Sequence, residues 1–587
     1  MCGIAGWFGT GTQALLDSMV GRLVHRGPDG QGTVEKGYAG IGSTRLSLID
    51  RFGGAQPARS ADGRHALVYN GELYNHAALG QRLRAAGHPV EGRGDTQVLL
   101  GALQAWGPAC LAELEGMYAF AWTDGAELVL ARDPFGIKPL FYSLVCGGRR
   151  LIFASEIKAL LADSSLSRVI DRSALVDFVV FRNVLGDKSF FRAIRQVPPG
   201  GVLHAARQSD GTIRLNLEQH GAPRPMVLSE DEAALPTVVL ERLAASVRSQ
   251  QVADHPVGAF LSGGLDSSLM TALMTREPGK DVHTFTVADT GDHPDVAASR
   301  QIAGALGTRH HELIYTPAEI LAKLATSTLS LEGPADLTIV NVAGPEIRRH
   351  VKAVLCGDGA DELFAGYPMH AQPARWVRAY AEIYNHLIRS GEVAAADCAT
   401  AKAALATLLR SDEDAMRDAV YRFMLASQLT FSHLLVWDRG AMQHGLEVRV
   451  PYLDTRLRDV ALALPWAWRI RGGQQKAALR CAAARVLPGA VQELVINRPK
   501  LAAPSALRAT TEALEVLARE LVPAALAARH PFRLYCRTPG TQLRLDLFIF
   551  LFIAHPGNVP AGFEWQTLYT HHAEALEAAL LTAARAD

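Results

Sequence analysis

The chain has 587 residues, of which 49% are hydrophobic and 20% charged, and its 59 basic residues balance its 59 acidic ones. This composition excludes wholesale disorder, and the balanced charge gives no sign of a nucleic-acid partner. The longest apolar run, at 547–554, is far shorter than the roughly 20 residues that a membrane span needs. The seven cysteines are scattered without a CxxC pair, so we expect neither a disulfide framework nor a zinc site. Because the N-terminus has no signal-peptide core either, we expect a cytoplasmic enzyme without membrane or nucleic-acid partners.

Residues 1–205 combine short apolar runs with helical patterns. The runs at 66–70 and 117–123 are bounded by Gly, Asp or Asn and predict strands, whereas 96–106 predicts a helix. Such a mixture favours packed sheets covered by helices. A polar stretch that contains Pro and Gly follows at 206–229, and we interpret it as a linker.

From residue 230 onward, predicted helices and strands alternate. Segments 236–249 and 294–306 have helical periodicity, and 257–261 and 351–356 are typical of buried strands. This alternation predicts a parallel sheet with right-handed crossovers. Beyond about Arg375 the chain is rich in Ala, Leu and Arg, and we expect it to be mostly helical.

A Gly-rich loop directly follows the predicted strand at 257–261. Its sequence, Ser-Gly-Gly-Leu-Asp-Ser-Ser at 262–268, places backbone N–H groups and hydroxyls where a helix begins, which favours anion binding. The Gly-Lys-Ser/Thr of a Walker loop is missing. Asp266 is a candidate Mg²⁺ ligand because hard cations prefer carboxylate oxygens and bridge phosphates. An N-cap aspartate without a metal is the alternative.

A second loop, at 357–362, follows the predicted strand at 351–356. It carries three carboxylates, those of Asp358, Asp361 and Glu362, beside two glycines. Such a cluster is unfavourable unless a cation neutralises it, so the loop predicts a metal or a cationic partner. Acidic residues that cap a helix are the alternative.

Cys2 becomes the N-terminal residue if Met1 is removed. Its α-amine, with a pKa near 8, then lies beside its own thiol and can act as the base for it. A cysteine at this position carries little information by itself, but it stands among other motifs.

Several motifs occur in an order that resembles the glutaminase domain of the class II, N-terminal-nucleophile amidotransferases. They are Cys-Gly-Ile-Ala-Gly at 2–6, His-Arg-Gly-Pro-Asp at 25–29, Arg-Leu-Ser-Leu-Ile-Asp at 45–50, Tyr-Asn-Gly-Glu-Leu at 69–73, Gly-Asp-Thr at 94–96, Arg-Asp-Pro-Phe-Gly at 132–136 and Ser-Glu-Ile-Lys at 155–158. With the Gly-rich loop downstream, which resembles that of the ATP pyrophosphatases, residues 1–504 resemble the glutamine-hydrolysing asparagine synthetases.

The resemblance implies an α/β protein of two domains. Residues 2–205 would form an αββα sandwich of the N-terminal-nucleophile hydrolase type. Residues 230–587 would form a parallel-sheet ATP-pyrophosphatase domain with a helical C-terminal part. Relatives are often dimers, so a homodimer is expected by analogy.

In the first domain the resemblance implies a glutamine-hydrolysing site. Cys2 would attack the side-chain amide of glutamine and form a thioester, with Asn70 and Gly71 as the oxyanion hole. Arg45 would bind the α-carboxylate of glutamine. The other predicted glutamine-binding residues are Leu46, Ile49, Glu72 and Asp95, the two acids being expected at the α-ammonium group. A hairpin turn at Asn70 and Gly71 is the alternative.

In the second domain the resemblance implies a site that adenylates a carboxylate with ATP and Mg²⁺. Asp358 would serve adenylate formation, Glu332 would be the base in the amination step, and Lys476 would stabilise charge on the phosphoryl group. Asp266 and Asp361 would bind Mg²⁺. The predicted ATP-binding residues are Leu261, Ser262, Gly263, Gly264, Asp266, Ser267, Ser268, Val287, Cys356 and Gly357.

The chain departs from the family pattern near the expected acceptor site. Cys356 stands where Ser is frequent, and Leu-Ala-Ala at 501–503 replaces the usual Gly-Phe. L-aspartate is the predicted acceptor, and another carboxylic acid of a natural-product pathway is the alternative. A β-lactam synthetase would lack the nucleophilic cysteine, and the intact Cys2 and Lys476 disfavour a non-catalytic homologue.

Overall fold

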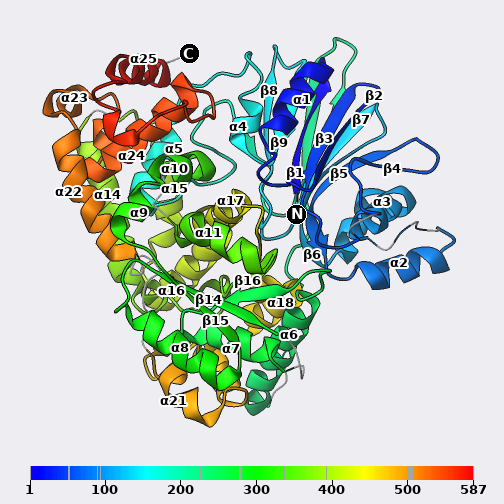
Figure 1. The fold of residues 1–587 in the computed structure, drawn as a ribbon, viewed down its shortest axis with the longest axis vertical. Coiled ribbons are helices and arrows are strands. Elements are labelled where there is room, and N and C mark those ends of the chain that lie inside the picture. The colour runs from blue at the N-terminus through cyan, green and yellow to red at the C-terminus, as the bar shows by residue number, and fades with distance from the viewer. Residues whose placement is uncertain are drawn as a thin grey trace.

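A computed structural model describes all residues except 1, 51–52, 89, 91, 93, 225, 227, 229–230, 277–280, 335–337, 392, 499–506 and 586–587. Its N-terminal part contains two antiparallel sheets that face each other (Figure 1). In spatial order, the first consists of β10 (Arg195–Gln196), β8 (Phe141–Val145), β9 (Arg150–Ala154), β1 (Cys2–Gly9), β3 (Ala39–Arg45) and β2 (Gly30–Lys36). The second consists of β12 (Ile213–Gln219), β11 (Gly201–Arg207), β7 (Glu127–Arg132), β6 (Gly116–Thr123), β5 (Ala66–Leu73) and β4 (Ala58–Arg59).

Apolar side chains from alternate strand positions fill the space between these two sheets. Phe8, Ile41 and Phe153 of the first sheet pack with Val68 and Leu130 of the second. The outer face of the first sheet is covered by α1 (Gln13–Gly21), α4 (Ile157–Leu160) and α5 (Arg172–Phe181), and that of the second by α2 (His76–Ala85), α3 (Asp95–Trp106) and η1 (Gly107–Glu113). The four layers confirm the predicted αββα sandwich.

Strand β12 lies inside the segment that was predicted as a linker. It pairs antiparallel with β11 along its whole length, from Ile213 opposite Arg207 to Gln219 opposite Gly201. Regular structure therefore continues to residue 219, and only the residues after it lead to the C-terminal part of the chain. The polar sequence of β12 is that of an exposed edge strand, which is why its composition resembled a linker.

A five-stranded parallel sheet organises the C-terminal part of the described chain. Its order is β15 (Arg309–Ile314), β14 (His283–Ala288), β13 (Val257–Phe260), β16 (Ala353–Leu355) and β17 (Glu447–Arg449). Its core is shared with α6 (Leu235–Ser249), α7 (Leu265–Met274), α8 (Pro294–Leu306), α11 (Ile339–His350), α18 (Thr455–Ala463), α20 (Ala477–Ala484) and α21 (Gly489–Ile496). The parallel pairing confirms the predicted α/β domain.

Most of the remaining chain is helical. The elements that precede residue 498 are η2 (Glu232–Ala234), α9 (Pro317–Leu321), α10 (Leu324–Leu331), α12 (Ala360–Leu363), α13 (Pro368–Ala371), α14 (Pro373–Arg389), α15 (Ala399–Leu408), α16 (Glu413–Phe423), the π-helix η3 (Met424–Leu434), α17 (Leu435–Met442), η4 (Pro451–Leu453), α19 (Trp466–Arg469) and the short hairpin of β18 (Ile470–Arg471) and β19 (Gln474–Gln475). Those after residue 506 are α22 (Arg508–Leu521), α23 (Ala524–Arg529), η6 (Arg533–Tyr535), α24 (Pro539–Ile549), η7 (Phe550–Ala554), η8 (Trp565–Thr567) and α25 (Ala573–Ala584).

The last helices return to the N-terminal part of the molecule, where Figure 1 shows α24 and α25 near α5. Phe548 of α24 packs against Phe191, and the backbone N–H of Ile170 donates to the carbonyl of Ala583 over 3.1 Å. Among the described residues, none of the helices combines the length and apolarity needed to cross a membrane.

A buried ion-pair network joins the two parts. Arg26 donates over 2.8 Å to Glu156 in the first part and over 2.8 Å to Asp438 of α17 in the second. Lys138 Nζ lies 3.3 Å from the other oxygen of Asp438. A carboxylate buried between two cations is costly to separate from them, so this network fixes how the two parts dock.

Candidate active sites

Cys2 is the first residue of β1 and is only 4% exposed. The register of β1 with β3 places it opposite Arg45. Its backbone N–H donates to Asn70 Oδ1 over 3.1 Å, and Gln56 Nε2 lies 3.5 Å from its Sγ. The antiparallel pairing of β1 with β3, together with strand β5 of the facing sheet, thus brings together the predicted glutaminase residues Cys2, Arg45 and Asn70.

Burial raises the pKa of the Cys2 thiol, and the backbone N–H of Leu46 and the charge of Arg45 only partly oppose this effect. A thiol in this setting stays protonated at neutral pH until a base removes its proton. The amine that removal of Met1 would create on Cys2 is a base of suitable strength and position.

Asn70 and Gly71 lie in the middle of β5, opposite Ala119 and Tyr118, which excludes the hairpin-turn alternative. Asn70 Nδ2 is buried and has no hydrogen-bond partner within the described residues. A buried amide donor of this kind is costly unless something accepts its hydrogen bond, as the oxyanion of a bound substrate would. At Gly71 a Cβ would lie 2.3 Å from the carbonyl oxygen of Met117, so the strand requires glycine there.

The two acids predicted to bind the α-ammonium group of glutamine are both buried. Asp95 Oδ2 accepts from the Tyr69 hydroxyl over 3.0 Å and from the backbone N–H of Leu73 over 3.1 Å. Glu72 Oε2 lies 3.3 Å from Arg449, which belongs to the second part of the chain. Burial raises the pKa of both carboxyls. A bound ammonium group would stabilise their charged forms.

Arg45 points its guanidinium into the segment that follows β3. Its Nη2 donates to the carbonyls of Asp50 over 2.6 Å and of Ile49 over 3.4 Å. Of the predicted glutamine-binding residues, Ile49 therefore contacts Arg45 through its backbone carbonyl, and Leu46 contacts the Cys2 thiol through its backbone N–H.

The predicted nucleotide loop, residues 262–268, joins β13 to α7 and is called the serine loop from here on. Gly263 has φ +73°, and a Cβ on it would lie 2.7 Å from the Cβ of Ala298. The hydroxyls of Ser262 and Ser267 lie 3.2 Å apart, and the Ser268 hydroxyl is buried without a hydrogen-bond partner in the described part of the chain. This arrangement leaves backbone and hydroxyl donors at the N-terminus of α7, where an anion is stabilised.

The other predicted ATP-binding residues lie on neighbouring strand ends of the same sheet. The backbone N–H of Leu261 donates to the carbonyl of Phe285 in β14, the strand that also carries Val287. After β16, Gly357 approaches the serine loop so closely that a Cβ on it would lie 3.2 Å from Asp266 Cβ. Ligands of open parallel sheets bind at these carboxyl ends.

Lys476 lies between the serine loop at 262–268 and the acidic loop at 357–362. Its Nζ lies 2.5 Å from Asp266 Oδ2 and 2.6 Å from Asp361 Oδ1. The two carboxylates come from different loops and converge on one point, and their oxygens are the ligands that Mg²⁺ prefers. The residues therefore fit a Mg²⁺ ion shared with a nucleotide phosphate, with Lys476 as a second cation.

His433 of η3 is a site residue that sequence reasoning missed. Its Nδ1 lies 3.6 Å from Asp358 Oδ1 and its Nε2 3.9 Å from Glu362 Oε1. Burial alone would lower the pKa of His433, but the hydrogen bond to Asp358 and the charges of Glu362 and Asp358 outweigh it and raise the pKa to about 8. A single histidine in a helical stretch gave no motif, so no sequence signal pointed to it.

Asp358 has a second partner in the thiol of Cys356, whose Sγ donates to Asp358 Oδ2 over 2.7 Å. Burial and the neighbouring Asp358 charge raise the pKa of this thiol well above its ordinary value. Cys356 therefore serves as a hydrogen-bond donor, the role that the more frequent serine would have.

Glu332 lies apart from Lys476 and the serine loop, at the junction of the two parts. Its Oε2 accepts from the backbone N–H of Ile157 and from Arg439, each over 2.8 Å, and its Oε1 accepts from the N–H of Lys158 over 2.8 Å. Burial raises the pKa of the Glu332 carboxyl although Arg439 opposes it. The N-terminal part thus directly holds a residue that was predicted for the amination step.

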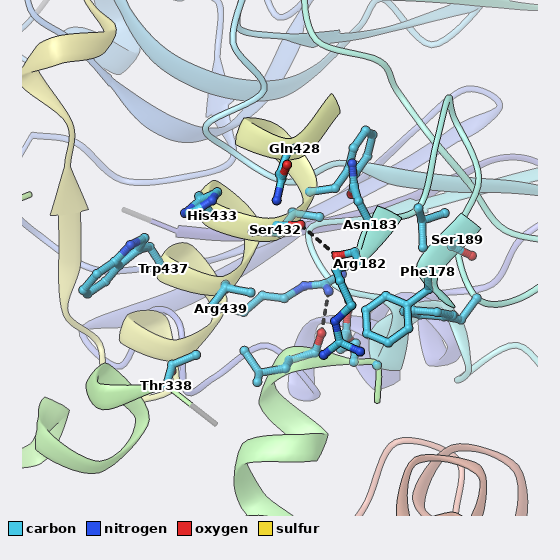
Figure 2. A pocket seen from close by; sticks show the side chains of 18 of the residues that line it. Phe178, Arg182, Asn183, Ser189, Thr338, Gln428, Ser432, His433, Trp437 and Arg439 are labelled. Carbon is cyan, nitrogen blue, oxygen red and sulfur yellow. Dashed lines mark hydrogen bonds and ion pairs between the residues drawn. The ribbon is translucent and has the colours of Figure 1, made fainter. Parts of the chain in front are cut away.

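Glu332 and His433 line one cavity of ≈ 520 Å³. Figure 2 shows that its walls come from both parts of the chain, with Phe178, Arg182 and Ser189 on one side and Gln428, His433 and Trp437 on the other. One lining residue, His433, also contacts Asp358 of the acidic loop at 357–362. The unusual residues 501–503, predicted to shape the acceptor site, lie outside the described residues.

Both parts of the chain match families of known proteins. Residues 238–538 match the asparagine synthase family model, and residues 1–214 match the glutamine amidotransferase domain. The chain is 28% identical over 566 residues to glutamine-hydrolysing asparagine synthetase 1 of Bacillus subtilis (strain 168), covering 86% of this chain and 87% of that protein. It is 30% identical over 528 residues to asparagine synthetase 3 of the same organism, covering 83% and 85%. It is 29% identical over 499 residues to asparagine synthetase B of Escherichia coli (strain K12), covering 79% and 75%.

Proposed function

Because the chain belongs to the asparagine synthase family, we propose that it is a glutamine-hydrolysing ligase that converts L-aspartate and ATP to L-asparagine, AMP and pyrophosphate. The observation that supports the proposal is that two clusters of predicted site residues assemble in one chain. One is a buried cysteine beside the partnerless amide donor of Asn70. The other is a serine loop beside the Asp266, Asp361 and Lys476 cluster.

In the first site, the α-amine of Cys2 takes the thiol proton, and the thiolate attacks the side-chain amide carbon of glutamine. Asn70 Nδ2 and the backbone N–H of Gly71 donate to the oxyanion of the tetrahedral intermediate. Ammonia leaves, and water then hydrolyses the thioester to glutamate. Arg45 holds the α-carboxylate of glutamine, while Asp95 and Glu72 face its α-ammonium group.

In the second site, the side-chain carboxylate of aspartate attacks the α-phosphorus of ATP, and pyrophosphate leaves. The serine loop binds the departing pyrophosphate through N–H and hydroxyl groups. Asp266 and Asp361 would hold Mg²⁺, which when bound neutralises phosphate charge, and Lys476 adds a fixed positive charge beside them.

Ammonia then attacks the acyl carbon of the adenylate, and AMP leaves. Attack requires loss of a proton from the ammonia nitrogen, and Glu332 is the proposed base because its pKa is raised and it lines a cavity whose walls come from both parts of the chain. Direct contact of Glu332 with the backbone of Ile157 and Lys158 lets the glutaminase part position this base.

The Cys2→Ala variant tests the division of labour. We expect it to lose glutamine-dependent asparagine formation and to retain synthesis from ammonium chloride, because free ammonia can reach the adenylate without the first site. Asparagine, glutamate and pyrophosphate are quantified with aspartate, glutamate and a panel of other carboxylic acids as acceptors.

Two results would contradict the proposal in different ways. Failure of ammonium to rescue a folded Cys2→Ala protein would refute the separation of the two sites. Pyrophosphate release with another acid but none with aspartate would refute asparagine as the product while leaving the adenylating chemistry intact.

A further inference from the structure

Three histidines converge at one edge of the parallel sheet. His283 is the first residue of β14, His311 lies on the neighbouring strand β15, and His350 is the last residue of α11. One ring nitrogen of each lies within 4.8 Å of those of the other two, and all three residues are half-buried. Figure 1 shows α11 alongside β14 and β15, so three separate segments supply the cluster.

The spacing of the first two rings is close to that of two ligands on one ion. His283 Nδ1 lies 3.0 Å from His311 Nε2. A tetrahedral Zn²⁺ with Zn–N bonds of about 2.0–2.1 Å holds its ligand nitrogens about 3.3 Å apart. The separation of these two nitrogens is thus close to that of two ligands on one ion. Because the ring planes are within 6° of each other, both rings must turn for their lone pairs to meet at a shared ion.

The third ring, that of His350, packs against the first two. The centroids of the His311 and His350 rings are 4.2 Å apart, and those of His283 and His350 are 5.5 Å apart. His350 is the last residue of α11, and a rotation of its side chain is needed to bring its nitrogen to an ion held by the other two rings. Phe285 packs against His311 with a centroid distance of 4.9 Å and gives the cluster an apolar back.

The charged neighbours are compatible with a cation. Glu346 Oε1 lies 3.6 Å from His350 Nε2, one turn earlier on α11, so a carboxylate faces a ligand ring as an outer-shell partner commonly does. Of the two nearby arginines, Arg309 pairs with Asp281 over 2.8 Å, and Arg349 lies 2.5 Å from the other oxygen of Glu346, so Glu346 is shared between Arg349 and His350.

We propose that His283, His311 and His350 form a binding site for a divalent first-row transition metal, with Zn²⁺ as its natural occupant. Neutral imidazoles are good ligands for this class of ion, and three of them leave a fourth position open for water. The site ties the edge strand β15 and its neighbour β14 to the end of α11. Because His283 begins β14 whereas the serine loop follows the end of the parallel strand β13, the ion lies toward the opposite end of the strands from the proposed nucleotide site, and its role is structural.

The test is metal binding by the full-length protein after removal of bound metal with a chelator. Calorimetry with Zn²⁺, in excess Mg²⁺ to occupy carboxylate sites, is expected to show one site. Co²⁺ substitution is expected to give visible d–d bands without thiolate charge transfer, and Zn²⁺ is expected to raise the melting temperature. His283→Ala and His311→Ala should each weaken Zn²⁺ binding by more than the about 10–100-fold that loss of an outer-shell partner costs.

His310→Gln is the matched control, because His310 lies next to His311 on β15 but its ring hydrogen-bonds to Thr284 on the other face of the sheet. This variant should bind Zn²⁺ like the parent chain. The proposal is wrong if the parent binds no Zn²⁺ under these conditions, if its Co²⁺ spectrum shows thiolate ligands, or if the His283 and His311 variants bind as tightly as His310→Gln. None of these results depends on the identity of the acceptor, so they leave the proposed function untouched.

Discussion

Lys476 is a single residue on which the charge balance of the second site depends. It lies within 2.6 Å of both Asp266 and Asp361, so its removal leaves the carboxylates of these two residues facing each other without their cation. We expect Lys476→Met to lower the rate of pyrophosphate release by about 10²–10³-fold, the cost of losing one preorganised charge at a reacting group. Glutaminase activity of Cys2 should persist, because the first site does not contain this lysine.

Pyrophosphate release and glutamate formation are measured separately in that variant. Lys402→Met, on the exposed surface of α15, is the control for loss of a surface charge. Unchanged pyrophosphate release in Lys476→Met would exclude the lysine from the adenylating step.

His433 makes a testable contribution to stability as a function of pH. Its pKa is raised to about 8 in the folded chain, against about 6.5 for an unperturbed histidine. A raised pKa means that the folded state binds the proton more tightly, so the stabilisation is complete below pH 6.5 and is lost as the pH rises to about 8. The difference of about 1.5 pKa units corresponds to about 2 kcal/mol.

Urea denaturation between pH 6 and 9 measures this effect. The parent chain should lose about 2 kcal/mol more of its unfolding free energy across this range than His433→Gln loses, while His571→Gln, at an exposed position, should follow the parent. Parallel pH profiles for the parent and His433→Gln would show that the Asp358 and Glu362 contacts do not hold the proton.

Residues within ordered motifs could be predicted from the sequence, and isolated ones could not. Cys2, Asn70, Asp266 and Lys476 occupy places in motifs, and the structure brings Cys2 next to Asn70 and Lys476 next to Asp266. His433 reaches Asp358 only because η3 packs beside the acidic loop. Such long-range contacts depend on tertiary packing, which leaves no local pattern in the chain.

The strand–loop–helix unit at β13 and α7 depends on glycine at one position. Gly263 has φ +73°, and a Cβ would meet Ala298 at 2.7 Å and the backbone nitrogen of Ser299 at 3.0 Å. We expect Gly263→Ala to displace the loop at a cost of about 1–3 kcal/mol and to weaken ATP binding accordingly, by about 10–100-fold.

The KM for ATP and the melting temperature are measured for Gly263→Ala and for Gly291→Ala. Gly291 lies in the loop before α8, has no neighbouring atom within 4 Å of an added Cβ and does not have a positive φ, so its variant should match the parent. Equal KM values for both variants would show that the loop tolerates a side chain.

At the scale of elements, periodicity located the buried strands and amphipathic helices well. The runs at 66–70 and 117–123 lie within β5 and β6, and the helical pattern at 96–106 lies within α3. Strand β1 was not predicted as a strand, because its glycines break the apolar pattern. These glycines are required by packing, since a Cβ on Gly6 would lie 2.4 Å from the carbonyl oxygen of Gly40 in the paired strand β3.

At the scale of the whole molecule, Asp438 links the stability of the chain to the first site. It is 3% exposed and pairs with Arg26, which also donates through Nε to the backbone carbonyl of Cys2 over 3.2 Å. We expect Asp438→Asn to destabilise the protein by about 3–5 kcal/mol, because it leaves Arg26 and Lys138 without this buried partner. Glutamine-dependent synthesis should fall more than ammonia-dependent synthesis, because the disturbance reaches Cys2.

Urea denaturation and paired assays with glutamine and with ammonium chloride measure both effects. Glu413→Gln, at an exposed position of α16, controls for the loss of one negative charge. An equal fall of both activities in Asp438→Asn would show that Asp438 supports the fold alone and not the coupling of the two sites.

Strand β12 forms an exposed edge of the second sheet in the first domain. It is the outermost strand of its sheet, and it carries the polar side chains of Arg214, Asn216 and Glu218. The neighbouring strand β11 contributes Val202 and Leu203 to the core and pairs with β12 along its whole length. A chain that stopped at residue 205 would leave the backbone hydrogen-bonding groups of β11 open to pairing with a strand of another molecule. The polar strand β12 covers these groups and thereby disfavours aggregation through edge pairing.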